Sequence, residues 1–222
     1  MKAWGWIEGR RLSAAWLALI AATSMPAAAQ VSSQGRGFVT FMIGQGSGPV
    51  GGVAANIVAG ANVAPETRST ATAYRVGGGY QFGDYLGTEL AVTHIGTLRS
   101  RAPFGTSDTL VAGLEFAAIE VDIVGRIPLA ANFRVDLSAG AAATGLKTSL
   151  ATTHGSALPP EPATLNARRA GPTVGADVEW RLGESMSLIA GWHLYSHVGS
   201  SSIVGLASGS MTLIAAGVHI EF

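Results

Sequence analysis

The stretch AAIEVDIVGRIPL, residues 117–129, separates apolar from charged side chains with a period of two. Ile119 and Val121 fall on one face, and Glu120 and Asp122 fall on the other. An α-helix would scatter these charges around its surface, whereas successive side chains of a β-strand point to opposite faces. The stretch therefore predicts a strand with one wholly apolar face and one charged face.

The same separation recurs in NFRVDLSAGAA, residues 132–142, and in PTVGADVEWRL, residues 172–182. A soluble β-sandwich also alternates, but its polar face is more often rich in Lys, Ser and Thr. Strands with one apolar and one charged face are typical of a transmembrane barrel that faces lipid outside and is lined by polar groups inside. The repeated pattern favours the barrel over the sandwich.

The N-terminus predicts a cleaved secretory signal peptide over residues 1–29. Lys2 precedes the apolar run LSAAWLALIAA, and Ala27 and Ala29 form an A-x-A cleavage pattern. The alternative is a permanent membrane anchor, but the run is short for a bilayer span and is followed by the helix breaker Pro26. The mature chain is then a single domain, residues 30–222.

The composition of this domain excludes some classes of function. Cleavage removes three of the 14 basic residues and one of the 14 acidic ones, which leaves 11 against 13 and gives no electrostatic footprint for nucleic acid. The chain lacks cysteine, as an exported protein without disulfides can. Its mean hydropathy is high, +0.34, yet no apolar stretch beyond residue 30 is long enough for a membrane helix. A closed β-barrel is the other structure that satisfies its backbone in lipid.

The connections predict the topology. Three tips are short, at residues 83–84, 128–132 and 183–184, and four polar segments rich in Gly, Ser and Pro are long. Long and short connections therefore alternate, which gives an all-β, eight-stranded antiparallel up-and-down transmembrane barrel with its long loops outside the cell. The long segments are residues 46–70, 97–108, 147–171 and 198–209. The predicted strands are residues 36–45, 71–82, 85–96, 110–127, 132–146, 170–182, 185–198 and 210–222.

Two stretches, GYQFGDYLGTEL at residues 79–90 and AAGVHIEF at residues 215–222, resemble the OmpA-like eight-stranded outer-membrane barrel family. The resemblance implies a bacterial outer-membrane protein that the outer-membrane assembly machinery inserts by recognising its last strand. In this sequence that signal would be Val218, Ile220 and Phe222. Because the chain ends at Phe222, the peptidoglycan-binding domain of larger family members is not expected.

An eight-stranded barrel is so narrow that side chains fill its interior, and ionised groups there must be paired. We expect a lumen charge network of Arg75, Glu89, Glu120, Asp122, Arg126, Arg134, Asp136, Asp177, Glu179 and Arg181, joined by His193, His219 and Glu221. Four arginines would then face seven carboxylates. The acid excess predicts that some carboxylates are protonated or lie in water near the barrel ends, with Glu221 the solvated one at the rim.

The network allows two functions. In the first, the network is a structural plug, and the barrel stabilises the envelope or presents loops to an extracellular ligand. In the second, the network lines a narrow ion-conducting path with Glu89 at its centre. The strand number favours the plug, because wide aqueous channels belong to larger barrels. The expected partners are outer-membrane lipids and lipopolysaccharide. Arg168 and Arg169 either contact lipopolysaccharide at the outer rim or lie in a plain solvated loop.

A third function, a lipid A-modifying hydrolase, rests on the segment HLYSHVGSSS. It supplies His193, Ser196, His197 and Ser200, but His193 and Ser196 are three residues apart and would lie on opposite faces of a strand. We therefore expect no enzymatic activity. No cofactor and no metal site is expected, since the five histidines lack metal-ligand spacing.

Overall fold

The computed structural model describes residues 35–48, 66–68, 70–104, 108–153, 163–198 and 209–222. The predicted signal peptide lies outside these residues. Nine strands and no helices are found among them, so no described helix is long and apolar enough to cross a membrane. The strands are β1 (Arg36–Ser47), β2 (Glu66–Arg68), β3 (Thr70–Gln81), β4 (Leu86–Phe104), β5 (Asp108–Ala130), β6 (Phe133–Thr153), β7 (Ala163–Arg181), β8 (Met186–Val198) and β9 (Gly209–Glu221).

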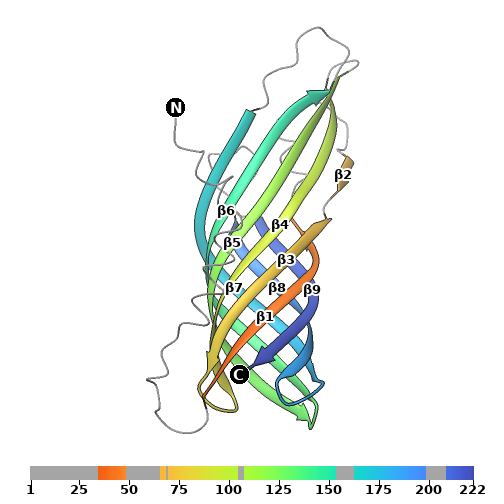
Figure 1. Ribbon diagram of the computed structural model, residues 1–222. Helices are drawn as coiled ribbons and strands as arrows, with labels where there is room; N and C mark the ends of the chain where they lie inside the picture. The colour runs from red at the N-terminus through yellow and green to blue at the C-terminus, as the bar shows by residue number, and fades with distance from the viewer. Residues whose placement is uncertain (1–34, 49–65, 69, 105–107, 154–162, 199–208) are drawn as a thin grey trace.

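Eight long strands form a closed antiparallel barrel (Figure 1). Their order is β4-β3-β1-β9-β8-β7-β6-β5, and an additional pairing of β5 with β4 closes the ring. The short strand β2 pairs with β4 opposite residues 99–101, on the same edge of β4 as β3, and so continues the position of β3 in the ring. The predicted eight-stranded up-and-down barrel is thus confirmed.

The first and last strands close the barrel against each other. Phe38 lies opposite Glu221, and the register continues until Ser47 lies opposite Thr212. Two backbone hydrogen bonds fasten the end of this seam, from Gly37 N to Phe222 O at 3.0 Å and from Phe222 N to Gly37 O at 2.9 Å. Closure matters in lipid because an open sheet edge would leave backbone groups without hydrogen-bond partners.

Alternation along the strands sorts side chains between lipid and interior. On β5, Ile119 and Val121 are 57% and 60% exposed, whereas Glu120 and Asp122 are 1% and 2% exposed. An outer apolar face and an inner polar face are what a barrel in a bilayer requires. Exposed aromatic side chains gather beside the short turns, as expected for a membrane interface: Phe82, Tyr85, Phe133, Trp180 and Phe222.

The two ends of the barrel differ in construction. We call the end with the connections 82–85, 131–132 and 182–185 the short-turn end, and the opposite end the long-strand end. Strands β4 to β7 contain 19 to 23 residues, whereas β1, β3, β8 and β9 contain 12 or 13. Figure 1 shows β4, β5, β6 and β7 rising beyond the other strands on one side of the barrel.

This difference corrects the prediction of loops at residues 97–108 and 147–171, except at residues 105–107 and 154–162, which lie outside the described residues. Strands β4 and β5 pair as far as Phe104 and Asp108, and β6 and β7 pair as far as Leu150 and Ala163. The prediction was wrong because the outward face of these strands becomes polar there, so that the apolar alternation fades although the inward face stays buried. Of the other two predicted long loops, residues 46–70 and 198–209, the parts 49–65 and 199–208 lie outside the described residues. Strand β2 occupies residues 66–68 of the first.

The barrel interior has two halves of opposite character. Near the short-turn end it is filled by ionised side chains, which we call the charged half. Toward the long-strand end it is filled by a contiguous hydrophobic cluster, which we call the apolar half. Fully buried members of the apolar half include Ile95, Leu98, Leu114, Phe116, Tyr195, Met211 and Leu213.

Candidate functional site

Arg75 on β3 is the centre of the inner part of the charged half. Its guanidinium donates two hydrogen bonds to Glu89, at 3.0 and 2.8 Å, and one to Glu120, at 2.7 Å. Asp122 lies 3.6 Å away. These four residues, which we call the central cluster, come from β3, β4 and β5, and Arg75 is only 1% exposed. A buried arginine between three carboxylates is stable only while all the pairs persist.

Hydroxyl groups attach the central cluster to the rest of the barrel wall. Thr173 donates to Asp122 Oδ1 at 2.6 Å, and Tyr195 donates to Glu120 Oε1 at 3.2 Å. Thr93 and Tyr195 share a hydrogen bond of 2.7 Å. Because Tyr195 also packs within the apolar half, it joins the two halves of the interior.

Glycine makes room for the central cluster. A Cβ at Gly77, directly between Arg75 and Gly79 on the inward face of β3, would lie 2.0 Å from Glu89 Oε1. At Gly79 it would lie 2.1 Å from the backbone oxygen of Thr88. The run of three glycines in the sequence therefore marks close approach between β3 and β4 and not a nucleotide-binding loop.

A second group of charges, the mouth cluster, lies closer to the short-turn end. It consists of Arg126, Arg134, Asp136, Glu179 and Glu221. Arg134 donates from Nε to Glu179 Oε2 at 2.9 Å and from NH1 to Glu221 Oε1 at 2.8 Å. Arg126 contacts the same Glu221 oxygen at 3.3 Å and Asp136 Oδ2 at 3.5 Å. Each carboxylate of the mouth cluster therefore has at least one arginine within ion-pair distance.

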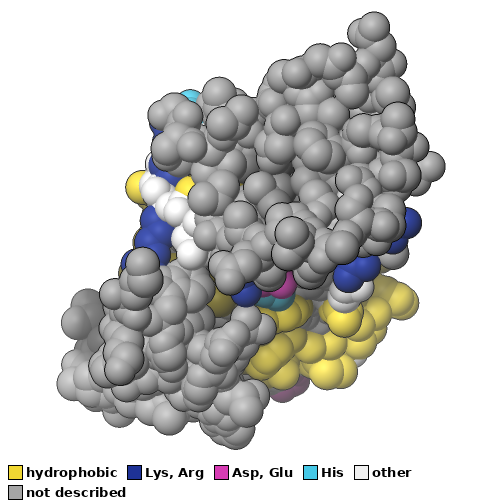
Figure 2. Space-filling model, turned by 90° about the horizontal axis from the view of Figure 1, so that it is seen from above, with side chains coloured by type: hydrophobic (Ala, Val, Ile, Leu, Met, Phe, Trp, Pro, Cys, Tyr) yellow, Lys and Arg dark blue, Asp and Glu magenta, His cyan; other side chains and the backbone are white. Residues whose placement is uncertain are grey.

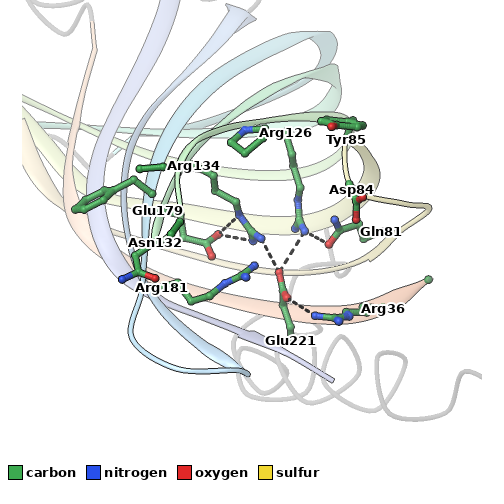
Figure 3. Close-up of a pocket in the computed structure, with 15 residues that line it drawn as sticks. Arg36, Gln81, Asp84, Tyr85, Arg126, Asn132, Arg134, Glu179, Arg181 and Glu221 are labelled. Atoms are coloured by element: carbon green, nitrogen blue, oxygen red, sulfur yellow. Dashed lines mark hydrogen bonds and ion pairs between the residues drawn. The ribbon is translucent and has the colours of Figure 1, made fainter. Parts of the chain in front are cut away.

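A pocket of about 640 Å³ opens at the short-turn end, with the mouth cluster at its base. Figure 3 shows the side chains of Arg126 and Arg134 converging on Glu221, while Arg36 approaches Glu221 from the rim at 3.6 Å. The pocket wall is mostly polar. Its volume is in the range of small-molecule sites, but its lining suits water and ions better than an apolar ligand.

The structure brings most of the predicted lumen residues together, with two differences. Arg181 is exposed and lines the pocket at the rim, so that among the described residues three arginines, not four, lie inside with seven carboxylates. The prediction of a solvated Glu221 is wrong: the residue is 6% exposed, because Arg36, Arg126 and Arg134 all converge on it. Asp177 pairs with His193 at 3.1 Å, apart from both clusters.

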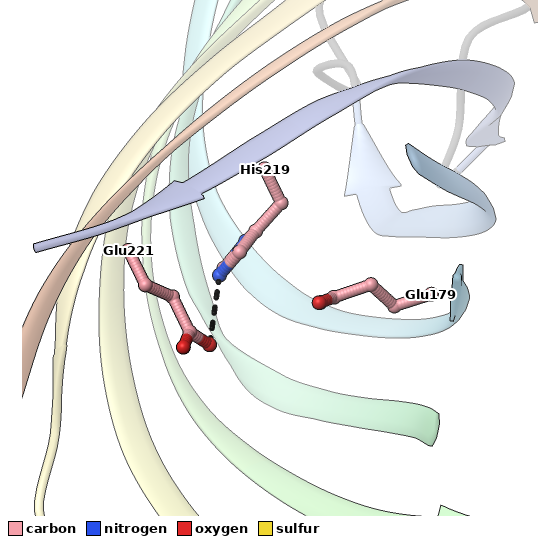
Figure 4. Close-up of side chains that lie close together, drawn as sticks. All are labelled: Glu179, His219 and Glu221. Atoms are coloured by element: carbon pink, nitrogen blue, oxygen red, sulfur yellow. Dashed lines mark ion pairs between the residues drawn. The ribbon is translucent and has the colours of Figure 1, made fainter. Parts of the chain in front are cut away.

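Sequence reasoning missed one convergence of side chains. Glu179 on β7 and His219 and Glu221 on β9 place one nitrogen or oxygen atom each within 4.8 Å of one another (Figure 4). No local spacing signals this group, because β7 and β9 are separated by β8 in the ring. To predict that these three side chains converge, one would need both the register of the strands around the barrel and the inward face of each strand.

The charged half does not continue toward the long-strand end, because the buried described residues of the apolar half include no ionised side chain. A further void in the described part of the barrel, beside Arg75 and His219, has a volume of only about 10 Å³. That is room for about one water molecule. Beyond the charged half, completely buried side chains such as Leu98 and Leu213 lie between this pocket and the long-strand end.

Comparisons with known proteins agree with this architecture. A family model described as "Outer membrane protein beta-barrel domain" matches residues 15–220. No curated protein sequence matches the chain significantly. Similar solved structures include Neisserial surface protein A (NspA), with 14% identity, a TM-score of 0.52, and coverage of 84% of this chain and 97% of that one.

Two further structures have the same fold. The attachment invasion locus protein Ail of Yersinia pestis has 10% identity, a TM-score of 0.50, and coverage of 86% of this chain and 100% of that one. A major outer membrane protein from Thermus thermophilus has 12% identity, a TM-score of 0.52, and coverage of 83% of this chain and 99% of that one. At such identities the likeness extends to the fold alone.

Proposed function

Because this chain belongs to the outer-membrane protein β-barrel domain family, and is an integral protein of the bacterial outer membrane, we propose that it acts without catalysis as a closed barrel whose long-strand end makes contacts outside the cell. Barrels of this class place short turns in the periplasm and longer connections outside. The observation that carries the proposal is the extension of β4 to β7 beyond the rest of the barrel.

The extension combines a firm interior with a polar exterior. Its inward residues Leu98, Leu114 and Leu146 are buried, so that the paired strands are held in place beyond the membrane. Most outward positions on the same strands are polar, as at Thr97 and Glu115, which are joined by a hydrogen bond of 3.2 Å. A rigid polar surface of this kind suits an extracellular partner or a neighbouring surface.

Basic side chains begin where the apolar outer face ends. Arg99 and Arg101 on β4, Lys147 on β6 and Arg168 on β7 occupy outward positions, and the three arginines are exposed. Figure 2, seen from the long-strand end, shows Lys and Arg side chains on two sides of the molecule, and on one side next to an apolar surface. We propose that these residues, together with Arg169, contact phosphates of lipopolysaccharide.

Shortening the extension tests the proposed function. Tight turns would replace residues 99–113, between the paired Leu98 and Leu114, and residues 147–166, between the paired Leu146 and Ala167. We expect the shortened barrel to keep its heat-modifiable gel mobility and the detergent resistance of the cells, while adhesion of expressing cells to protein-coated surfaces falls. Adhesion equal to that of the full chain would contradict a contact role, and a loss of detergent resistance alone would favour envelope stabilisation.

A narrow ion-conducting pore is the second candidate, favoured by the charged half and its pocket. The apolar half argues against it, because a path through fully buried Leu98 and Leu213 would have to open before ions could pass. Planar-bilayer recording on the refolded barrel should give no discrete conductance. Discrete openings that are altered by Glu89→Ala would support the pore instead.

A lipid A-modifying hydrolase has little support from the geometry. His193 faces the interior and bonds to Asp177, whereas Ser196 is on the outward face of β8, and Ser200 lies outside the described residues. A nucleophile and its base must lie within hydrogen-bond distance. We expect mass spectra of lipid A to be unchanged by expression of this protein, and a new deacylated species would contradict a non-catalytic role.

A further inference from the structure

We propose that Glu179, His219 and Glu221 form a binding site for a divalent transition-metal ion of the zinc class, with the side chain of Arg134 as the competing occupant. The proposal is independent of what the long-strand end contacts. One imidazole and two carboxylates are a donor set that zinc accepts, and the adjoining pocket gives access from the periplasm and space for a water ligand.

The ring of His219 is held in the orientation that a metal ligand needs. Its Nε2 lies 3.2 Å from Arg134 NH2, and a guanidinium can only donate, so Nε2 carries a lone pair directed at the group. Nδ1 then holds the proton and donates to Thr40 Oγ1 at 3.1 Å. Phe38 stacks on the ring at a centroid distance of 4.9 Å. A hydrogen bond at the far ring nitrogen is the usual outer support of a metal-bound histidine.

Glu179 supplies a separate indication of a missing ligand. The residue is 1% exposed, and its Oε1 has no hydrogen-bond partner among the described residues, although Oε2 is bonded to Arg134. A buried carboxylate oxygen without a partner is costly. Figure 4 shows the Glu179 carboxylate directed toward His219 and Glu221. Tetrahedral zinc with bonds of about 2.1 Å holds its donors roughly 3.4 Å apart. The three donor atoms now lie within 4.8 Å of one another, so a small movement of the flexible glutamate side chains would bring them to this spacing.

Arg134 is the arginine that can leave. Its side chain is 12% exposed, whereas the side chains of Arg75 and Arg126 are each 1% exposed, and it borders the pocket of about 640 Å³ into which it can turn. In this structure its guanidinium bonds to all three donor groups and so occupies the place of a cation.

The charge balance favours replacement of the Arg134 guanidinium by a divalent metal ion. Asp136, Glu179 and Glu221 carry three negative charges, and with Arg134 turned into the pocket a divalent ion and Arg126 would neutralise them fully. The interior as a whole holds seven carboxylates against three arginines among the described residues, so an added positive charge relieves an existing excess.

Zinc titration of the full refolded barrel in detergent, against a chromophoric chelator, tests the site. We expect one Zn²⁺ per wild-type barrel and affinity roughly tenfold tighter in Arg134→Gln, which removes charge-assisted hydrogen bonds that compete with the metal. Thr40→Val should weaken binding by about 10-fold to 100-fold through loss of the ring support. Glu179→Gln should weaken it at least as much, and Mg²⁺ should not compete.

The matched control is Arg181→Gln, which changes an arginine that lines the same pocket but is not among the arginines bonded to the three donors. Its zinc affinity should equal that of wild type. Heat-modifiable gel mobility confirms that each variant is folded. Absence of zinc binding by wild type, including the case in which only Arg134→Gln binds, overturns the proposal. Binding that survives Glu179→Gln unchanged also overturns it, since the metal would then be held elsewhere, for example at another histidine.

Discussion

The two halves of the barrel interior exclude water by opposite means. The apolar half does so with side chains such as Leu98 and Leu213, which pack without needing particular partners. The charged half does so with pairs such as Arg75 and Glu120, each of which depends on the other. Loss of one apolar side chain leaves a cavity, whereas loss of one ion leaves its partners buried and unpaired. The comparison predicts that the charged half is the more sensitive to single substitutions.

Arg75→Met should have the largest effect on stability. The change keeps most of the side-chain volume but leaves Glu89, Glu120 and Asp122 buried around an uncharged group. We expect the free energy of unfolding to fall by about 3–5 kcal/mol, measured by urea unfolding of the barrel in lipid. Adding Glu120→Gln to Arg75→Met should recover part of the loss.

Leu98→Ala should cost less than Arg75→Met, although Leu98 is completely buried. A leucine-to-alanine change in a packed core costs about 2–5 kcal/mol, and we expect the lower part of this range because neighbouring Met211 can move into the space. The same urea titration measures it. A loss greater than that of Arg75→Met would show that packing, not pairing, dominates the interior.

Deletion of Phe222 separates assembly from stability. The residue is 66% exposed and contributes two backbone hydrogen bonds to Gly37, so its removal should lower the unfolding free energy by only about 1–3 kcal/mol. If Val218, Ile220 and Phe222 form the assembly signal, the yield of inserted barrel in cells should fall severalfold. Equal proportional losses in yield and in stability of the refolded protein would leave Phe222 as a membrane contact only.

His197→Gly should have the smallest effect, and in the opposite direction. His197 has a φ of 57° at an irregularity in the pairing of β8 with β9, where a side chain is strained. Glycine adopts this conformation freely, so we expect a gain of about 1 kcal/mol in the unfolding free energy. Destabilisation would mean that the imidazole makes contacts worth more than the strain.

The sequence predicts the fold well because the barrel obeys a local rule. Period-two alternation at residues 117–129 and the short turns do not depend on distant parts of the chain. The rule fails at residues 97–104, 147–153 and 163–171, where the outward face is mostly polar and the strands are defined by pairing with their neighbours. It also could not reveal that Tyr195 and Phe116 pack together, with ring centroids 5.3 Å apart, to begin the apolar half.

For the candidate site, sequence alone indicates which residues face inward but not which of them meet. Alternation places Glu179 and Glu221 on inner faces, yet their approach to His219 follows from the tilt and stagger of strands that are not adjacent in the ring. The same limit explains the wrong expectation for Glu221. Position near the chain end suggested water, while the structure surrounds it with arginines from β1, β5 and β6.

The seam between β1 and β9 has a consequence for how the barrel is made. Every other neighbouring pair in the ring joins strands that follow one another along the chain, apart from the small β2, whereas Phe38 and Glu221 meet across almost the whole barrel sequence. Hairpins between successive strands can form in microseconds, but bringing distant segments together costs far more chain entropy. The pairing of β1 with β9 should therefore form last. Until β1 and β9 pair, the sheet has two open edges whose backbone groups can pair with another chain. The lifetime of this open sheet therefore determines how much the protein aggregates during folding.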